Sequence, residues 1–452
     1  MRSTSTLLLV LFAAASLRAE TPPVQGTLPE DYLPGLKPLL AVAVERSPNT
    51  ILSSINLAQQ EAQRYVYAYV LWPSIAGNAS YGINNDSVSG GTVSTERGLF
   101  YNVGLNQPVF QWMAYKNNAE IGALGVKIAQ RQFAEAYRAL AVQIREQYMY
   151  LISKKISLRN AHYRQKISEE TLAAMQAKLE AGSASQADLQ GYQIALQQAQ
   201  LDTDRSAEDY SYAKRVFTRL VGIDDVDEES IPIELPHPEY SSPLADAVLA
   251  GFVADGAESA FQSEIYQMIV KQQDLNYAIA KVRLLPKINA AVTYSLADQT
   301  TAFGGQVSQV KVQTEAYSIA ANWTIFDGFL TRGSKLGALA TKRYYERTRQ
   351  TFIDSTIDSV TYLRHQIGLS SRALALSELH NSLIAAEVKR ITDDVKLGYA
   401  SQATLETSNM DLYVTEFDLT FARTDYLSKW TEFVSTAGMD PAISNISARY
   451  VR

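Results

Sequence analysis

The stretch Gly182-Ser183-Ala184-Ser185-Gln186-Ala187-Asp188-Leu189 is repeated, with changes, as Gly398-Tyr399-Ala400-Ser401-Gln402-Ala403-Thr404-Leu405. The offset between the two copies is 398 − 182 = 216 residues. The same offset relates segment 106–110 to 322–326 and segment 217–224 to 433–440. A single offset that holds across several segments indicates an internal duplication. Because there are two copies, the sequence predicts a paired architecture rather than a solenoid.

Each copy contains a long stretch in which apolar residues recur every seven positions. In the first copy these residues are Tyr137, Ile144, Leu151 and Leu158, and in the second they are Ile353, Val360, Ile367 and Leu374. A seven-residue repeat favours helices that supercoil and pack side by side. A helix of about 65 residues is about 100 Å long, far beyond the mean of about 11–12 residues. The sequence predicts long helices over 112–181 and 329–397, a glycine turn after each, and return helices over 185–221 and 401–437.

Segments of alternating apolar and small or polar residues precede each long helix. This period of two predicts four strands, over 74–84, 99–110, 287–297 and 316–326. Aromatic residues near the segment ends are predicted to lie at a membrane interface, and they are Tyr81, Tyr101, Trp112, Tyr294, Tyr317 and Trp323. The alternative for this pattern alone is a soluble hairpin with one wet face.

Four strands cannot close a barrel, and an open sheet edge in lipid leaves backbone groups unpaired. If the strands enter a membrane, two or more chains must therefore share one barrel. Two chains would give eight strands and a filled interior, whereas three would give twelve and room for a channel. The residues expected to face inward are small, which favours three chains.

The domain layout follows from these elements. Residues 1–19 are predicted to be a cleaved signal peptide, with an apolar run over 7–15 and a cut after Ala19 or Ala15. The first repeat covers 20–223 and opens with a helix over 38–71. An acidic, Pro-rich linker covers 224–243. The second repeat covers 244–440, opens with a helix over 244–284, and is followed by a tail over 441–452.

The composition excludes several classes of function. With 41 Lys+Arg against 47 Asp+Glu, the net charge of −6 argues against a nucleic-acid partner. The chain has no Cys and 4 His, so we expect no disulfide, no metal site and no cofactor. Ser211 and Lys214 match the spacing of penicillin-recognising enzymes, but the other motifs of those enzymes do not follow. We expect no enzymatic activity.

The chain resembles the TolC-type outer-membrane efflux proteins over nearly all of its mature length. The motifs that carry the resemblance are Ala43-Val44-Glu45-Arg46-Ser47-Pro48-Asn49, Leu71-Trp72-Pro73-Ser74-Ile75, Gly104-Leu105-Asn106-Gln107-Pro108-Val109-Phe110, Trp323-Thr324-Ile325-Phe326-Asp327-Gly328, and the tips Leu179-Glu180-Ala181-Gly182 and Val395-Lys396-Leu397-Gly398. The resemblance implies an α+β membrane protein that forms a homotrimer. Four strands per chain would contribute to a shared twelve-stranded barrel in outer-membrane lipid, and long helical hairpins would form a tunnel in the periplasm. It implies passive export of drugs, metals or polypeptides from a periplasmic membrane-fusion adaptor and an inner-membrane pump.

The resemblance also implies site residues at the helical tips. Adaptor docking is implied for Gly182, Ser183, Ala184, Ser185, Gly398, Tyr399, Ala400 and Ser401. Acids that follow the tip glycine by six or nine residues project into the closed end of the family's tunnel. Asp188 matches this pattern, whereas Thr404 and Thr407 stand at the equivalent positions of the second copy. We expect the pore constriction at Asp188, with Glu406 as the next candidate.

Two other functions remain as alternatives. A general outer-membrane porin would explain the strands but not helices of about 100 Å. A soluble periplasmic coiled-coil adaptor would explain the helices but not four strands with aromatic ends. Extraction with detergent from the outer membrane distinguishes the channel from the soluble adaptor.

Overall fold

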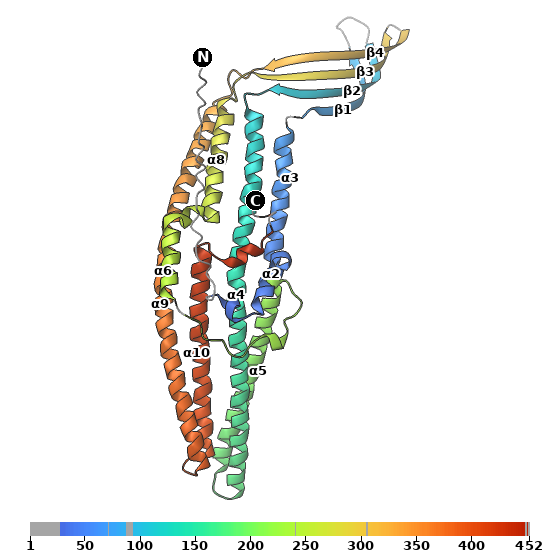
Figure 1. Cartoon of the computed structure of the whole chain (residues 1–452). Coiled ribbons are helices and arrows are strands. Elements are labelled where there is room, and N and C mark those ends of the chain that lie inside the picture. Colours follow the sequence, from blue (N-terminus) through green and yellow to red (C-terminus); the bar gives the residue numbers. More distant parts are fainter. Residues whose placement is uncertain are drawn as a thin grey trace, which may run out of the picture.

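The computed structural model describes residues 28–70, 72–86, 94–239, 241–303, 306–447 and 450. The predicted signal peptide lies outside the described residues. The molecule is a long helical shaft with a β-sheet at one end and, at the other, two turns that each connect a pair of helices (Figure 1). Shorter segments surround the middle of the shaft.

Four helices form the lower half of the shaft. They are α4 (Ala114–Glu180), α5 (Gln186–Val221), α9 (Leu330–Lys396) and α10 (Gln402–Thr436). Their contacts place them in the order α9–α10–α4–α5, so that α10 and α4 are the inner pair and α9 and α5 the edges. The bounds of α4 and α9 differ by 216 residues at both ends, 330 − 114 and 396 − 180. The duplication of the sequence is therefore a duplication of the backbone.

The opening helix of each repeat is broken, where the sequence predicted one continuous helix. In the first repeat, α2 (Leu36–Arg46) ends at Ser47, and α3 (Pro48–Tyr69) starts directly afterwards with its proline in the first turn. Proline has no N–H to donate, so it fits a first turn better than a helix interior. In the second repeat, α6 (Ser242–Gly251), the π-helical turn η2 (Phe252–Gly256) and α7 (Ala257–Ser259) precede α8 (Phe261–Lys281). Ala260 is extended there, with φ −60° and ψ 139°, and separates α7 from α8.

The sheet contains four antiparallel strands in the order β1–β2–β3–β4. They are β1 (Ser74–Asp86), β2 (Ser94–Phe110), β3 (Lys287–Phe303) and β4 (Gln306–Asn322). The strands extend further from the shaft than the sequence predicted, and β4 ends four residues earlier than the expected 326. Polar residues that we assigned to loops, such as 306–315, are paired across the hairpin, because cross-strand hydrogen bonds can hold polar residues in a strand.

Near the shaft, the strand register places the larger apolar residues of all four strands on one face. Ile75 pairs with Leu105, Leu105 with Val292, and Val292 with Tyr317. The neighbouring rung, which faces the other way, joins Asn106 and Ala291 and then Ser318. Paired residues share a face, and successive residues alternate between faces. The sheet therefore has one apolar face and one small, polar face near the shaft.

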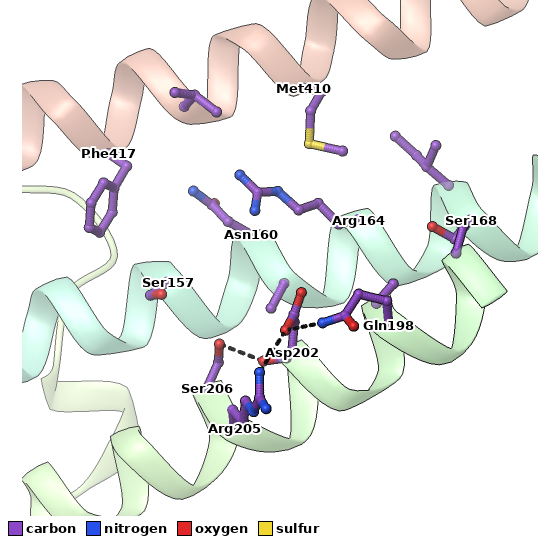
Figure 2. A pocket seen from close by; sticks show the side chains of 15 residues that line it. Ser157, Asn160, Arg164, Ser168, Gln198, Asp202, Arg205, Ser206, Met410 and Phe417 are labelled. Atoms are coloured by element: carbon purple, nitrogen blue, oxygen red, sulfur yellow. Dashed lines mark hydrogen bonds and ion pairs between the residues drawn. The ribbon is translucent and has the colours of Figure 1, made fainter.

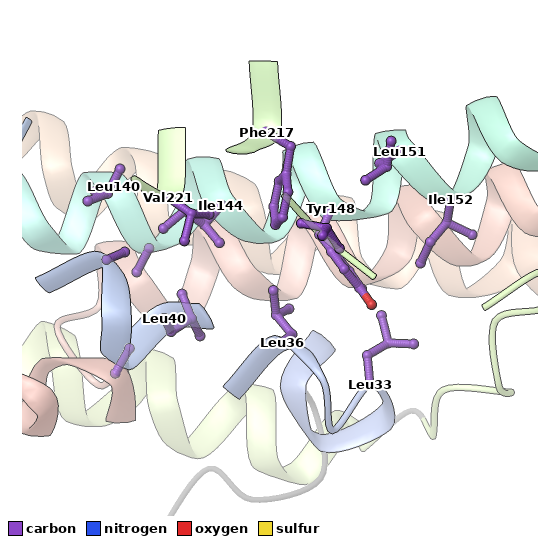
Figure 3. Packing of buried hydrophobic residues seen from close by; sticks show 14 of the residues in the cluster. Leu33, Leu36, Leu40, Leu140, Ile144, Tyr148, Leu151, Ile152, Phe217 and Val221 are labelled. Atoms are coloured by element: carbon purple, nitrogen blue, oxygen red, sulfur yellow. The ribbon is translucent and has the colours of Figure 1, made fainter. Parts of the chain in front are cut away.

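A belt of short segments packs against the middle of the shaft. The belt consists of α1 (Pro29–Tyr32), α2, segment 224–239 with η1 (Glu228–Ser230), and η3 (Pro441–Asn445). Figure 3 shows Leu36 and Leu40 of the belt against Ile144 and Tyr148 of α4. Tyr148 also donates a hydrogen bond to the carbonyl oxygen of Ser230 at 2.9 Å. Apolar side chains from the belt, α4 and α5 thus form one continuous core.

A fully buried arginine joins the two ends of the belt to the shaft. Arg145 of α4 is 0% exposed and contacts Glu30 and Asp440 with two guanidinium nitrogens each. Burial alone would lower the pKa of Arg145, but the hydrogen bonds and charges of Asp440 and Glu30 outweigh it and raise that pKa. A buried charge is tolerated only when it is paired and hydrogen-bonded. Arg145 therefore depends on both carboxylates.

Candidate functional site

Both hairpin tips end their long helix with the same glycine motif. Gly182 and Gly398 have φ of +73° and +77°, a left-handed conformation that glycine adopts without steric cost. In the first tip, the N–H of Ser183 bonds the carbonyl of Lys178, and the N–H of Gly182 bonds that of Leu179. The second tip repeats this pattern, which satisfies the last carbonyls of each helix.

The return helices also begin alike. Ser185 and Ser401 cap α5 and α10, each accepting a hydrogen bond on its hydroxyl oxygen from the backbone N–H three residues later. In the first tip, the Asp188 carboxylate accepts in return from the N–H of Ser185 at 3.0 Å and from its hydroxyl at 2.6 Å. These bonds lower the pKa of Asp188. In the second tip, the Thr404 hydroxyl lies 2.8 Å from that of Ser401. The threonine therefore replaces the acid in the cap without its charge.

The tip residues that the resemblance implied for docking form two accessible loops. Gly182, Ser183, Ser185, Gly398, Tyr399 and Ser401 are exposed, and Ala184 and Ala400 are half-buried. A Cβ atom added at either glycine would meet nothing within 4 Å. The tips differ most at Tyr399, whose side chain is 82% exposed where the first tip has Ser183. The small residues leave the backbone of both turns open to an approaching partner.

The two residues predicted for a pore constriction lie in different environments. Asp188 is exposed, and its carboxylate is occupied by the cap of α5. Glu406 lies one turn into α10, is half-buried, and raises the pKa of Tyr163 on α4 as a minor contribution beside the burial of that tyrosine. The two acids therefore belong to different hairpins, and a role for either at a constriction remains a prediction.

The tyrosines predicted for a membrane interface lie on one face of the sheet. Tyr101 pairs with Ala79, which shares its face with Tyr81, and Tyr317 pairs with Val292, which shares its face with Tyr294. Because Tyr294 pairs with Val103, the same face continues to Tyr101. Tyr317 lies nearest to the shaft, Tyr294 and Tyr101 lie near the middle of the sheet, and Tyr81 lies further out. Their contact with lipid remains a prediction.

The two predicted tryptophans lie where strands pass into helices. Trp323 is exposed directly after β4. Trp112 follows β2, donates a hydrogen bond from Nε1 to the carbonyl of Pro286 at 2.7 Å, and packs edge-on against Phe110. Its φ of 53° is left-handed, which is uncommon for a bulky residue. Gly328 stands at the equivalent position of the second repeat with φ 63°. The left-handed backbone between strand and helix therefore occurs in both repeats, at a tryptophan in the first and at a glycine in the second.

The sequence reasoning missed the cluster of Glu30, Arg145 and Asp440. A signal was present, because Arg145 is a charged residue in a part of α4 where the neighbouring residues are apolar and buried. Asp440 belongs to the repeated Gly-x-Asp segment, whose first copy ends in the exposed Asp224. Nothing in the local pattern distinguishes the buried copy from the exposed one.

Neither a metal-binding cluster nor a helix able to span a membrane occurs among the described residues. Within these ranges, no group of three or more His, Cys, Asp or Glu side chains lies close enough to hold a metal ion. None of the helices that the structure describes combines the length and apolar composition needed to cross a membrane.

The fold matches solved outer-membrane channels along almost its whole length. The channel OprN matches with a TM-score of 0.69 at 14% identity, covering 97% of this chain and 98% of that one. The Campylobacter jejuni outer membrane channel CmeC matches with a TM-score of 0.67 at 12% identity, covering 100% and 97%. The open state of the Neisseria gonorrhoeae MtrE outer membrane channel matches with a TM-score of 0.64 at 17% identity, covering 90% and 89%. At these identities the matches establish the fold.

The sequence itself matches a protein family over its first repeat. Residues 39–222 match the family model of the outer membrane efflux proteins. No protein with a curated description matches the chain. The family model and the channel fold agree with the motifs at the strand ends and tips, and with the location in the outer membrane that the resemblance implied. The first repeat therefore matches the outer membrane efflux protein family, and the whole chain has the fold of solved outer membrane channels, as the resemblance to the TolC-type proteins implied.

Proposed function

We propose that three copies of this chain form one channel that passively conducts cargo from a periplasmic adaptor and inner-membrane pump to the exterior. The observation that carries the proposal is the sheet. Its four strands have one apolar face, and β1 and β4 each pair with a single neighbour among the described strands. An unpaired edge in lipid costs several kcal/mol for each lost hydrogen bond, whereas a closed barrel has no edge. Joining β4 of one copy to β1 of the next closes twelve strands.

The shaft supports the same stoichiometry. Three copies of the α9–α10–α4–α5 layer give twelve helices, and neighbouring helices pack about 8–10 Å apart. Such a ring has a radius of about 15–19 Å at the helix axes. Subtracting a helix radius of about 5 Å leaves a lumen of about 10–14 Å radius. Three belts of helices about 10 Å thick would fill that lumen, so the belt belongs on the outside.

Adaptor docking is assigned to the tips because both turns are exposed and, apart from Tyr399, built from small residues. Small residues let another backbone approach closely. We expect that replacing Ala184 and Ala400 with arginine abolishes export while trimer and membrane insertion persist. Export at the normal level in the double variant would place docking elsewhere.

The constriction is assigned to the ring of three Asp188 carboxylates. Like charges about 8 Å apart repel by about 2 kcal/mol at an effective dielectric of about 20 and attract cations. Asp188→Asn is therefore expected to lower cation selectivity in planar bilayers and to weaken block by multivalent cations from the periplasmic side. Unchanged selectivity with an intact trimer would leave Asp188 as a helix cap and make Glu406 the next residue to test.

The central experiment is the mass of the detergent-extracted channel. We expect three times the mass of one chain, and channel activity in planar bilayers. A monomer that inserts stably into bilayers would contradict the shared barrel. Recovery of the protein without detergent would favour a soluble adaptor. A protein that conducts in bilayers and whose transport is unchanged by substitutions at the tips would favour a porin.

A further inference from the structure

A groove runs along α4 on the face that the belt leaves open. Its upper part has a volume of about 470 Å³ and lies between α4 and α10. It shares Ser157 and Phe417 with a lower part of about 630 Å³, which α5 also lines. Figure 2 shows Phe417 and Met410 of α10 facing Ser157 and Arg164 of α4 across the lower part. The two parts form one continuous depression.

The position of the groove on α4 fixes the direction it faces. Ile144, Tyr148 and Leu151 pack against the belt and α5. The groove residues Glu146, Tyr150 and Ser157 point the other way, because at 100° per residue their mean direction is nearly opposite to that of the belt-facing residues. In the proposed trimer the belt lies outside, so this face of α4 lines the lumen.

The upper groove carries aromatic side chains that no neighbouring chain needs to cover. Phe421 is 65% exposed and Tyr150 is 47% exposed, and Phe417 lies half-buried beside them. They belong to α4 and α10, the inner helices of the layer, whereas neighbouring copies would pack against the edge helices α5 and α9. Exposed aromatic faces of this kind bind cations through the ring quadrupole.

The charge of the upper groove favours a positive ligand. Glu146 is exposed in the groove and forms no ion pair among the described residues. Burial and the nearby charge of Glu432 raise its pKa, and Lys429 lowers it by a smaller amount, so the carboxylate is not fully compensated. The positive charge of Lys154 is balanced by Asp209 at 2.6 Å, and its ammonium lies over the Tyr150 ring, 5.4 Å from the centroid, so that Phe421 has the ring face open to a ligand. The lower groove differs, because Arg164 lines it.

We propose that the upper groove, built from Glu146, Tyr150, Phe417 and Phe421, is a contact site on the tunnel wall for organic cations that carry an aromatic or apolar group. This inference rests on the proposed function and names the cargo class that the lumen favours. The ring face of Phe421 would hold the apolar part and the charge, Tyr150 would line the groove beside it, and Glu146 would complement the charge. Three such sites would surround the lumen at one level.

The test is block of single-channel current by three small probes. Phenyltrimethylammonium combines a ring with a positive charge, tetramethylammonium has the charge without the ring, and benzenesulfonate has the ring with a negative charge. We expect phenyltrimethylammonium to block at the lowest concentration. Phe421→Ala and Glu146→Gln should each raise its half-blocking concentration about threefold to tenfold. Phe421→Leu should give a smaller rise, because it keeps an apolar surface and loses the ring face.

Glu234→Gln is the matched control, since Glu234 is an exposed acid on the belt and should leave block unchanged. Equal block by benzenesulfonate, or no effect of Phe421→Ala and Glu146→Gln in trimers that conduct normally, would overturn the cation site and leave the channel function intact. Failure of the wild-type chain to conduct at all would contradict the proposed function itself, and the inference with it.

Discussion

The two long helices have the same backbone and different surroundings. α4 and α9 have equal length and equivalent bounds, yet α4 is buried along much of its length by α3, α5, α8, α10 and the belt. α9 lies at the edge of the layer and exposes Tyr362, Leu369, Leu376 and Leu383 in steps of seven residues. A heptad stripe of this kind is the seam of a helix pair. The copy inside the layer meets its partners within the chain, whereas the copy at the edge leaves this stripe uncovered within the chain, as the proposed trimer requires.

The difference extends to single residues at equivalent positions. Arg145 of α4 corresponds to Thr361 of α9, whose hydroxyl bonds only the carbonyl of Ile357 in its own helix. Asp440, which is buried against Arg145, corresponds to the exposed Asp224. Duplication thus gave two equal backbones, and substitutions at a few positions made one of them the centre of the belt.

The largest expected difference between the repeats is at these two aspartates. Asp440→Ala leaves the buried Arg145 with one carboxylate, and breaking a buried ion pair costs about 3–5 kcal/mol. Asp224→Ala removes an exposed acid and should change stability by less than about 0.5 kcal/mol. Thermal unfolding followed by helical circular dichroism compares the two variants. Equal midpoints would show that the belt does not depend on the cluster.

The next difference concerns the glycines that end the return helices. Gly222 has φ +82°, and a Cβ added there would lie 2.1 Å from the carbonyl oxygen of Arg46. Gly438 has φ +72° and nothing within 4 Å. Gly438→Ala should therefore lower the free energy of unfolding by about 1–2 kcal/mol, because alanine adopts the left-handed conformation at a cost. Gly222→Ala should lower it by about 1–3 kcal/mol more, because the new Cβ atom forces repacking against α2. The same unfolding measurement applies, and equal losses would mean that α2 moves away without cost.

The caps of the two tips should behave alike, in contrast to the glycines. Ser185→Ala and Ser401→Ala each remove the hydroxyl that satisfies an orphan N–H, which costs about 1 kcal/mol of local stability. Hydrogen exchange of the first turn of α5 and of α10 measures this locally. A loss at one tip alone would show that the second serine is not the cap in solution.

The smallest expected effect distinguishes the tips by pH. The pKa of Asp188 is lowered in the folded tip by its bonds to Ser185. The contribution of Asp188 to the stability of the tip is therefore complete above the ordinary pKa of a free aspartate. It is lost as the pH falls through the lower pKa of the folded tip. The second tip, with Thr404, has no such group in its cap. Pepsin should cut the first tip increasingly as the pH falls, relative to the second, and Asp188→Asn should remove this change.

Local patterns were enough to predict the two long helices, the return helices and the turns between them. The seven-residue repeat and the tip glycines are both signals read within one or two helical turns. The strand ends were not predictable in this way, because residues such as Gln309 and Thr314 are held in β4 by their partners in β3. The helix break at Ala260 could not be predicted either, because no proline stands near it in the sequence.

The cluster at Arg145 was beyond local reasoning for a different reason. Its partners lie 115 and 295 residues away in the chain, one on each side. The order of the helical layer was likewise absent from the sequence pattern, since the heptads of α4 and α9 are equivalent. The aromatic and acidic groove depends on that order, because it exists only where α10 lies beside α4.

The buried arginine also sets a condition on when the molecule can be completed. Glu30 is made before α4 and Asp440 long after it. A chain that has crossed into the periplasm only as far as α9 holds a guanidinium without its second counter-ion, and burying it then would be strongly unfavourable. We therefore expect the belt to close only when both repeats are present, and fragments that lack the Asp440 segment to form no native belt. A single side chain would in this way couple closure of the belt to the presence of the full chain.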